Sequence, residues 1–421
     1  MSGALGVLDQ DDGENSAQVR RANSNEQTRD LSPDSLVHDI IDETEELICD
    51  IERGEDDNGD SIHGNLWSSN HDFYSRSDSD TAQDQTLSWD FLAVITAICE
   101  VYKGGTYLKM MMLDARHWKP LSTGSTFSVS RSEMKFSVYS SRDHRRKETV
   151  SNRVVMKRNT YYGDMTAAQV RSFVKELRVL HHLSNNPFIV NLRGVGWFDK
   201  PLDESTRYFN PALILEEAFN TLDYLIGPTV AMAYEDMLEI FGQMTLGLRA
   251  LHQCSLVHGD LKPGNVLLFE RLVSREGVQI KSYLAKLSDF ESVACKAEKL
   301  SFCPGTRGYR APEVDRAAGA GGVPVSFEQL MMADAWSLGM VFAVMLLGDQ
   351  DFLEEINPIG RVKEAVSGIK TKLESSTTET AHAMVAIKLL EHTLRQKPTD
   401  RDLDLVEREL EPFLRDVQPN R

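Results

Sequence analysis

Residues 257–268 decide the fold of this chain, and they read Val257-His258-Gly259-Asp260-Leu261-Lys262-Pro263-Gly264-Asn265-Val266-Leu267-Leu268. An aspartate, a lysine two positions later and an asparagine five positions later are followed at once by an apolar run. The proline and glycine indicate a loop, and the short apolar run indicates a buried strand. A lone acid in a loop is more often a turn or cap residue. The joint spacing of the three polar residues is what predicts a site at the start of the strand.

Two further runs lie downstream of this loop. They read Leu287-Ser288-Asp289-Phe290-Glu291 and Gly305-Thr306-Arg307-Gly308-Tyr309-Arg310-Ala311-Pro312-Glu313. In this order the three stretches resemble the HRD…N, DFG and APE motifs of the eukaryotic protein kinases, in which His258 and Phe290 would be structural residues. The resemblance covers about residues 115–415. It implies an α+β, bilobal protein kinase-like fold with a small β-rich N-lobe and a larger helical C-lobe.

The chemistry that the resemblance implies is phosphoryl transfer from ATP. In such a reaction the charge on the transferring group is neutralised and the acceptor is held in line. Asp260 would accept the proton of the substrate hydroxyl, and Lys262 would offset charge on the γ-phosphate. Asn265 and Asp289 would hold Mg²⁺, because a hard cation prefers carboxylate and amide oxygens.

The resemblance also implies an ATP site upstream of the catalytic loop. Lys157, at the end of a predicted strand, would contact the α- and β-phosphates, and Glu176 on the next helix would be its ion-pair partner. Leu215 would be the gatekeeper of the hinge between the lobes. The backbones of Glu216 and Ala218 would hydrogen-bond adenine.

Other motif residues are expected to be structural or to define the acceptor. Asp334 matches the helix residue that anchors the catalytic-loop backbone, and Arg401 is expected to pair with Glu313. Thr306 fits the position that packs on the catalytic aspartate and lysine in serine/threonine kinases. The order Asp-Leu-Lys-Pro-x-Asn is similar to the catalytic loop of serine/threonine kinases, so the resemblance implies serine or threonine acceptors.

The sequence departs from the family pattern at three places. Family members carry a GxGxxGxV phosphate loop, whereas residues 122–129 keep only Gly124 and Val129 of that pattern. The loss of glycines is expected to weaken or reshape ATP binding, because glycine lets backbone amides approach phosphates closely. Gly259 replaces the arginine that meets a phosphorylated activation loop, so we expect no requirement for that phosphorylation. Glu291 replaces the glycine of DFG, and we expect it to alter Mg²⁺ affinity or to hinder the flip of this segment.

We consider three candidate functions for these residues. An active serine/threonine protein kinase is favoured because Lys157, Glu176, Asp260, Asn265 and Asp289 are all present. The alternative is a pseudokinase, a scaffold or allosteric module without turnover, which the poor glycine loop and the glutamate in the DFG position support. A small-molecule kinase is disfavoured, because the intact APE segment resembles a peptide-binding segment.

The acidic excess of the chain is confined to its first fifth. The chain of 421 residues has a net charge of −18, and residues 1–90 hold 23 acidic and 5 basic side chains, which accounts for all of it. An acidic chain lacks the basic footprint of a protein that coats nucleic acid. Low hydrophobicity with high net charge predicts disorder over 1–88. Within this tail, residues 35–52 predict an amphipathic helix, either for docking a partner or self-inhibition, or as a transient helix or one packed on the core.

The compartment follows from signals that the sequence lacks. We see no apolar run of the ~18 residues that a membrane span needs, and no basic-then-apolar signal pattern at the N-terminus. Five scattered cysteines with no CxxC pair argue against a disulfide framework or a zinc site. We therefore expect an intracellular protein, cytoplasmic by default, with the nucleus left open.

The expected boundaries follow from changes in composition and period. The acidic disordered tail is 1–88, a helical lead-in 89–114, the N-lobe 115–215 and the C-lobe 216–416. The lead-in resembles that of some fungal kinase-like proteins. Strands are predicted at 126–130, 135–139, 150–157 and 213–215, and helices at 167–183, 234–252, 331–347 and 381–396. The basic run 142–147 is predicted to be a solvated loop, with a docking patch as the alternative.

Overall fold

The computed structural model describes part of the compact unit Ile62–Arg421. The described residues are 94, 97–98, 109–113, 118–123, 127–139, 147–159, 166–198, 211–227, 232–275, 277–296, 305–319, 325–348, 366–368, 370–371 and 380–414. The predicted tail, the 35–52 helix, residues 142–146 of the basic run and Gly124 lie outside these residues, whereas Lys147, expected in the loop, begins strand β4 (Lys147–Asn159).

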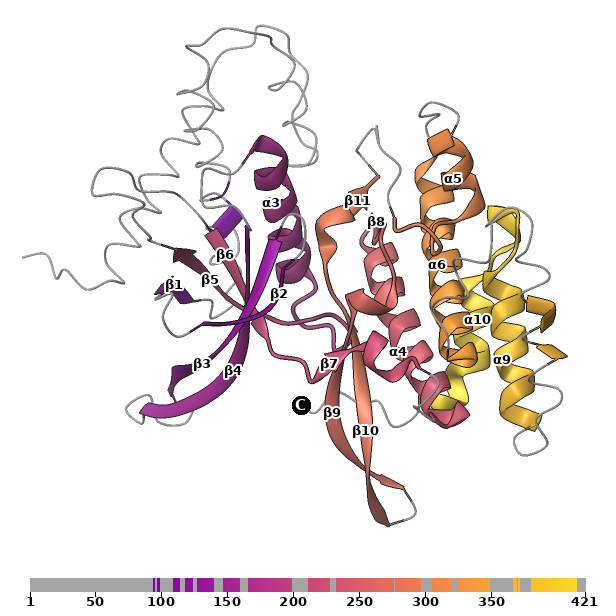
Figure 1. Cartoon of the computed structure of the whole chain (residues 1–421), viewed down its shortest axis with the longest axis horizontal. Helices are drawn as coiled ribbons and strands as arrows, with labels where there is room; N and C mark the ends of the chain where they lie inside the picture. Colours follow the sequence, from indigo (N-terminus) through magenta and orange to yellow (C-terminus); the bar gives the residue numbers. More distant parts are fainter. Residues whose placement is uncertain are drawn as a thin grey trace, which may run out of the picture. The chain divides into compact units, whose positions relative to one another are not determined.

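The N-lobe is built on a six-stranded sheet with the order β1-β5-β6-β4-β3-β2. Neighbouring strands are antiparallel, except that β1 runs parallel to β5. The strands are β1 (Lys109–Leu113), β2 (Lys119–Thr123), β3 (Phe127–Tyr139), β4 (Lys147–Asn159), β5 (Leu192–Phe198) and β6 (Pro211–Glu216). Figure 1 shows helix α3 (Ala167–His182) beside this sheet.

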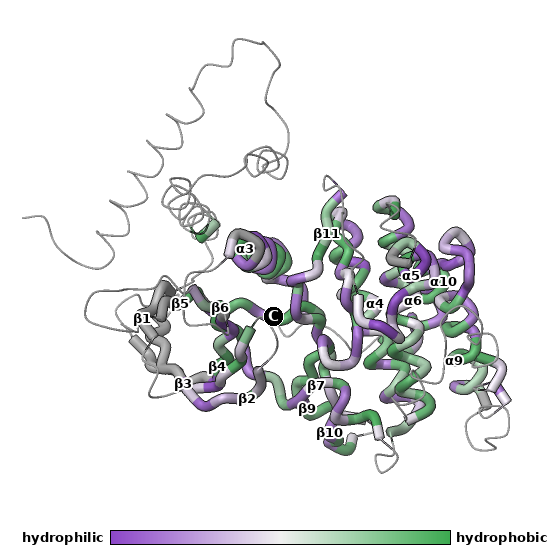
Figure 2. The backbone as a smooth tube through the Cα atoms, turned by 45° about the horizontal axis from the view of Figure 1, so that its top comes forward, coloured by the Kyte–Doolittle hydropathy of each residue, from purple (hydrophilic) through white to green (hydrophobic). Residues whose placement is uncertain are grey.

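Helix α3 begins at a capping box. The side chain of Thr166 accepts a hydrogen bond from the backbone N–H of Gln169, and the Gln169 side chain accepts one from the backbone N–H of Thr166. These two bonds satisfy backbone donors that have no partner within the helix. Hydrophobic and hydrophilic positions alternate around α3 in Figure 2, as they do in a helix with one packed face.

Two predictions for the N-lobe are wrong in detail. The expected strands 126–130 and 135–139 form one strand, β3, which pairs with β4 over 13 residues. Residues 109–113, expected in the helical lead-in, form β1. A short apolar run such as Met110–Leu113 fits a buried helix or a buried strand equally well by periodicity, and here it pairs with the edge of β5. Of the lead-in helix, Val94, Ala97 and Ile98 are described, and they are helical and buried.

The C-lobe is mainly helical. Its helices are α4 (Tyr234–Gln253), α5 (Pro312–Gly319), α6 (Phe327–Leu347), α9 (Thr380–Thr393) and α10 (Leu403–Leu410). Its strands are β7 (Asn220–Thr221), β8 (Leu256–Val257), β9 (Val266–Arg275), β10 (Val278–Leu287) and β11 (Ala294–Cys295). Strands β9 and β10 pair over ten residues and project from the lobe as a long hairpin, which the sequence did not predict (Figure 1).

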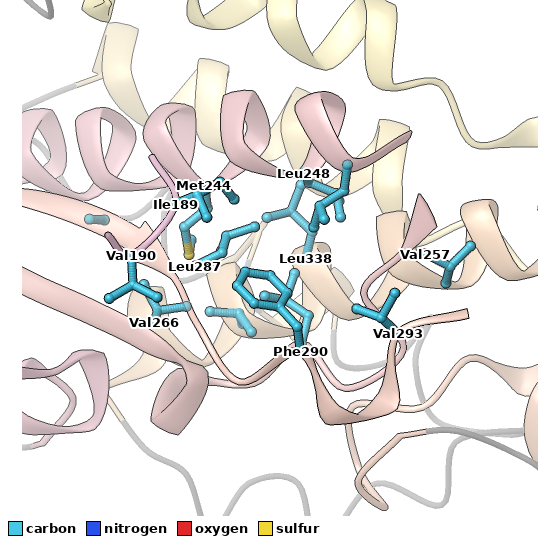
Figure 3. Close-up of a cluster of buried hydrophobic side chains, with 14 of the residues drawn as sticks. Ile189, Val190, Met244, Leu248, Val257, Val266, Leu287, Phe290, Val293 and Leu338 are labelled. Carbon is cyan, nitrogen blue, oxygen red and sulfur yellow. The ribbon is translucent and has the colours of Figure 1, made fainter. Parts of the chain in front are cut away.

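Helix α6 lies at the centre of the C-lobe. It is 21 residues long and, by length and composition, apolar enough to cross a membrane, so the expectation that no stretch of that length exists was wrong; however, 78% of its most apolar stretch is buried inside the protein. Burial of this kind identifies the core helix of a globular lobe. Figure 3 shows how the core reaches the candidate site: Phe290 lies among Leu287 of β10, Met244 and Leu248 of α4, and Leu338 of α6.

Candidate active site

A cavity of about 880 Å³ collects most of the predicted site residues. Its walls come from the N-lobe strands, the segment that follows β6, the catalytic loop 258–265 and the residues that follow β10. The predicted residues among its lining are Val129, Lys157, Glu176, Leu215, Glu216, Ala218, Asp260, Lys262, Asn265, Asp289 and Glu291.

Lys157 lies in a cluster of three carboxylates. Its Nζ is 2.8 Å from Oε2 of Glu176, 2.7 Å from Oδ1 of Asp289 and 2.8 Å from Oε1 of Glu291. The ring of Phe127 lies beneath the same ammonium, 5.0 Å from centroid to Nζ. The pair with Glu176 joins β4 to α3, and the other two pairs join β4 to the segment after β10.

The pKa values in this cluster follow from burial and from the charges. Burial alone would lower the pKa of Lys157, but the three carboxylates raise it. Burial raises the pKa of Glu176, and Lys157 opposes that rise. Burial likewise raises the pKa of Glu291 to about 7; Lys157 opposes the rise and Asp289 adds to it. For Asp289 burial is outweighed by Lys157, which lowers the pKa of this carboxyl.

Asp260 is oriented by three neighbours from two segments. Oγ1 of Thr306 donates to Oδ1 of Asp260 at 2.7 Å, and Nζ of Lys262 donates to Oδ2 at 2.8 Å. Lys262 also lies 3.0 Å from Oγ1 of Thr306. Nδ2 of Asn265 donates to the Asp260 carbonyl at 2.7 Å. The carboxylate of Asp260 is therefore held in one orientation at the wall of the cavity.

The loop that carries Asp260 is fixed by a buried acid on helix α6. The backbone N–H of His258 donates to Oδ2 of Asp334 at 2.8 Å, and that of Gly259 donates to Oδ1 at 3.0 Å. His252 of α4 contacts the same carboxylate at 3.0 Å. Gly259 has φ +80°, a conformation that glycine adopts without strain.

His258 is buried and links the catalytic loop to the segment after β10. Its Nδ1 accepts from the Asp260 N–H at 3.3 Å, so its Nε2 carries the proton and donates to the Ser288 carbonyl at 3.1 Å. Ser288 in turn donates from its hydroxyl and its N–H to the Asn265 carbonyl, each at 3.0 Å. Sequence reasoning missed Ser288. Its position immediately before Asp289 was the available signal.

Asp289 has a left-handed backbone, with φ +64° and ψ +73°. Such a conformation is uncommon outside glycine and is held by surrounding structure. Phe290 after it is fully buried and lies 5.5 Å from the His258 ring. Strand β11 then pairs with β8, next to the catalytic loop. Backbone pairing and core packing thus fix the Asp289 segment from both ends.

The side chain of Glu216, at the predicted hinge, makes contacts that sequence reasoning missed. Its Oε1 accepts from the Asn191 N–H at 2.9 Å and from Nζ of Lys286 at 2.6 Å. Lys286 lies on β10 of the C-lobe and is buried, with Nζ 4.7 Å from the Phe269 ring centroid. The lysine stands out in the sequence only as a charge within an apolar strand. The pair ties the hinge to the C-lobe.

Another buried ion pair holds the end of the activation segment. Arg401 donates in bidentate fashion to Glu313, at 2.6 and 2.9 Å, and its guanidinium stacks 5.0 Å from the Trp336 ring. Nearby, Arg310 donates to the Gly305 carbonyl and to Asp315. A bidentate pair such as Arg401–Glu313 fixes the relative orientation of its two side chains and also stabilises the folded protein.

The fold and the comparisons define the class of the protein. Residues 136–403 match the family model of the protein kinase domain. The match spans more than half of the chain, and the chain belongs to the protein kinase domain family. The described residues have the two lobes of that fold.

Several similar proteins are named serine/threonine-protein kinases, and others are named mitogen-activated protein kinases or mitogen-activated protein kinase kinases. The chain is 29% identical over 191 residues to serine/threonine-protein kinase SBK1 of Mus musculus, an alignment that covers 45% of this chain and 40% of that protein. It is 27% identical over 249 residues to serine/threonine-protein kinase 32B of Homo sapiens, covering 59% of this chain and 54% of that one. The chain spans about two fifths of the length of the first relatives it matches. A chain in the structure of the CAK complex from Chaetomium thermophilum bound to ATP-gamma-S is similar with a TM-score of 0.47 and 23% identity, covering 72% of this chain and 92% of that chain.

Proposed function

We propose that the chain is an ATP-dependent protein kinase that transfers the γ-phosphate to serine and threonine hydroxyls of proteins. The observation that carries the proposal is the oriented Asp260 carboxylate, which lines one cavity together with Lys157 and Asp289. A positioned carboxylate within hydrogen-bond reach of an acceptor hydroxyl is what a general base requires.

The chain's own residues divide the work. Asp260 orients the acceptor hydroxyl and takes its proton. Lys262, bonded to Asp260 and Thr306, lies where it can offset charge on the transferring phosphoryl group. Lys157 binds the phosphates of the nucleotide, and the backbone of the hinge at Glu216 and Ala218 binds adenine.

The donor set fits a magnesium ion. Asn265 and Asp289 both line the cavity and offer an amide oxygen and a carboxylate, the hard ligands that Mg²⁺ takes beside nucleotide phosphates. These two residues would hold the ion. When bound, it neutralises phosphate charge.

We also propose that activity does not depend on a phosphorylated activation loop. Gly259 offers no side chain to bind a phosphate. The end of the segment is held by bonds within the protein, from Thr306 to Asp260 and from Arg310 to the Gly305 carbonyl and Asp315. Treatment with a phosphatase should leave the rate of peptide phosphorylation unchanged, and loss of that rate would contradict the proposal.

A nucleotide-binding pseudokinase is the second candidate, and one observation favours it. The ammonium of Lys157 faces three carboxylates, so a nucleotide phosphate must compete for it. This function keeps the fold and the binding of nucleotide but lacks turnover.

Transfer of γ-labelled phosphate from Mg-ATP to peptides tests the proposal. The acceptors are three matched peptides that differ only in serine, threonine or tyrosine at one position. The wild-type chain and Glu407→Gln, which removes one carboxylate on α10, should label the serine and threonine peptides. Asp260→Asn should not. Equal labelling by wild type and Asp260→Asn would overturn the kinase assignment, and labelling of tyrosine alone would overturn the acceptor class.

A further inference from the structure

The ammonium of Lys157 has no donor left over. A lysine carries three N–H donors. Glu176, Asp289 and Glu291 each place a carboxylate oxygen within 3.0 Å of Nζ. A phosphate can therefore reach this lysine only if one of the three carboxylates moves away.

Exposure and attachment differ among the three acids. The Glu176 side chain is 2% exposed, and both of its oxygens lie within 3.0 Å of Lys157. The Asp289 side chain is 37% exposed, but it sits on a constrained left-handed backbone and is needed for the proposed metal. The Glu291 side chain is 26% exposed, and it comes from the short helical turn Phe290–Ser292. Of the two acids that are partly exposed, Glu291 is the one that the proposed metal does not need, so it is the carboxylate that can move aside.

We infer that Glu291 is a built-in competitor for nucleotide phosphates at Lys157, so that it sets the affinity of the site for ATP and ADP without changing the affinity for the nucleoside. This inference rests on the proposed nucleotide site. The carboxylate stands in for a phosphate oxygen, because both are anionic acceptors for the same ammonium. A nucleotide that binds displaces it into the solvent-facing part of the cavity.

The charge balance adds to the direct competition. With all three acids ionised, one ammonium faces three carboxylates, and the excess negative charge repels an entering phosphate. Electrostatic repulsion is strong in a partly desolvated cavity. A neutral side chain at position 291 relieves the repulsion. Glycine there also frees one N–H of Lys157, whereas the amide oxygen of glutamine can still accept from it, without the negative charge. Adenosine has no phosphate, so its binding is insensitive to both effects.

The test measures ligand binding by calorimetry on the full chain. The variants are Glu291→Gln, which keeps the size of the side chain, and Glu291→Gly, which removes it; Glu407→Gln controls for overall charge. The ligands are ADP, a non-hydrolysable ATP analogue and adenosine, each measured with Mg²⁺ and with EDTA. Both Glu291 variants should bind the two phosphate-bearing ligands on the order of tenfold more tightly, as expected for loss of one close like charge. The affinity for adenosine should not change, and Glu407→Gln should match wild type for every ligand.

Four results would overturn the inference, and three of them concern the Glu291 variants. Their ADP affinity could be unchanged, their affinity for adenosine could rise equally, or they could bind nucleotide more weakly only when Mg²⁺ is present, which would make Glu291 a metal ligand instead. Absence of ADP and adenosine binding in every variant would overturn it as well. Tighter ADP binding by the Glu291 variants, with no phosphate transfer by any variant, would sink the proposed catalysis and leave this inference standing.

Discussion

Single residues in the catalytic loop are held by contacts that lie far away in the sequence. Asp260 is oriented by Thr306, and its loop is anchored by Asp334 on helix α6. The types and spacing of these residues could be predicted from the sequence, because each motif is local. The sequence did not predict that Glu291 contacts Lys157. Members of the family have glycine at this position, so they offer no side chain from which the direction of Glu291 could be inferred.

Glu291 should give the chain a distinct dependence of stability on pH. Its pKa rises from 4.5 to about 7 on folding, so the folded state holds the proton more tightly. Its stabilising contribution is then complete below pH 4.5 and is lost as the pH rises through 7. Glu291→Gln removes this loss. The difference in Tm between Glu291→Gln and wild type, measured by calorimetry, should grow in favour of the variant from pH 5 to pH 7.5.

The matched variant for this experiment is Glu407→Gln, whose Tm difference from wild type should stay nearly constant over the same range. Parallel curves for Glu291→Gln and wild type would show that the carboxyl does not change its pKa on folding.

Elements of the C-lobe pack so closely that one glycine becomes necessary. A Cβ at Gly339 of α6 would collide with Oγ1 of Thr393 on α9 and would lie 2.7 Å from its Cβ. Thr393 is fully buried and donates to the Leu389 carbonyl at 2.8 Å, so it has no room to retreat. The contact fixes the distance between the two helices.

Gly339→Ala should therefore destabilise the protein, by about 1–3 kcal/mol, as overpacking of a core usually does. Urea unfolding monitored by circular dichroism gives this value. Gly368→Ala is the matched control, because a Cβ there meets nothing within 4 Å, and it should be neutral or slightly stabilising. Equal stability of Gly339→Ala and Gly368→Ala would mean that the two helices are not in close contact.

The lengths of elements were harder to predict than their existence. Helices α4 and α6 begin and end within a few residues of their predicted bounds. Apolar residues cover one face or all faces of these helices, and this pattern shows in the sequence where each helix begins and ends. The β9–β10 hairpin was missed beyond its first residues. Its distal half mixes charged, polar and apolar side chains, including the exposed Leu272 and Lys281, and it has no core that would impose a regular alternation.

At the scale of the whole molecule, the two lobes are joined through charged groups as well as through the chain. Glu216 of the hinge bonds to Lys286 of the C-lobe in a largely buried environment. The sequence predicted the hinge but not this pair, since the two residues are 70 positions apart. Pairing at that distance depends on how β6 and β10 approach each other, which no local pattern contains.

Glu216→Ala should leave the buried ammonium of Lys286 without its main partner. Removing one member of a buried pair costs about 3–5 kcal/mol, and the unfolding midpoint in urea should fall accordingly. The double variant Glu216→Ala/Lys286→Met should recover part of the loss, because no buried charge then remains unpaired. If Glu216→Ala is as stable as wild type, the pair does not tie the hinge to the C-lobe.

The central claim is that Asp260 serves phosphoryl transfer in an intact kinase site. The most direct measurement is kcat/KM for phosphorylation of the serine peptide by wild type and Asp260→Asn, with Glu407→Gln as control and with folding checked by equal Tm values. General-base catalysis is typically worth about 10²–10⁴-fold, and we predict a fall of that size for Asp260→Asn alone. A measurable wild-type rate that Asp260→Asn retains in full, or no rate above background in any variant, would contradict the account.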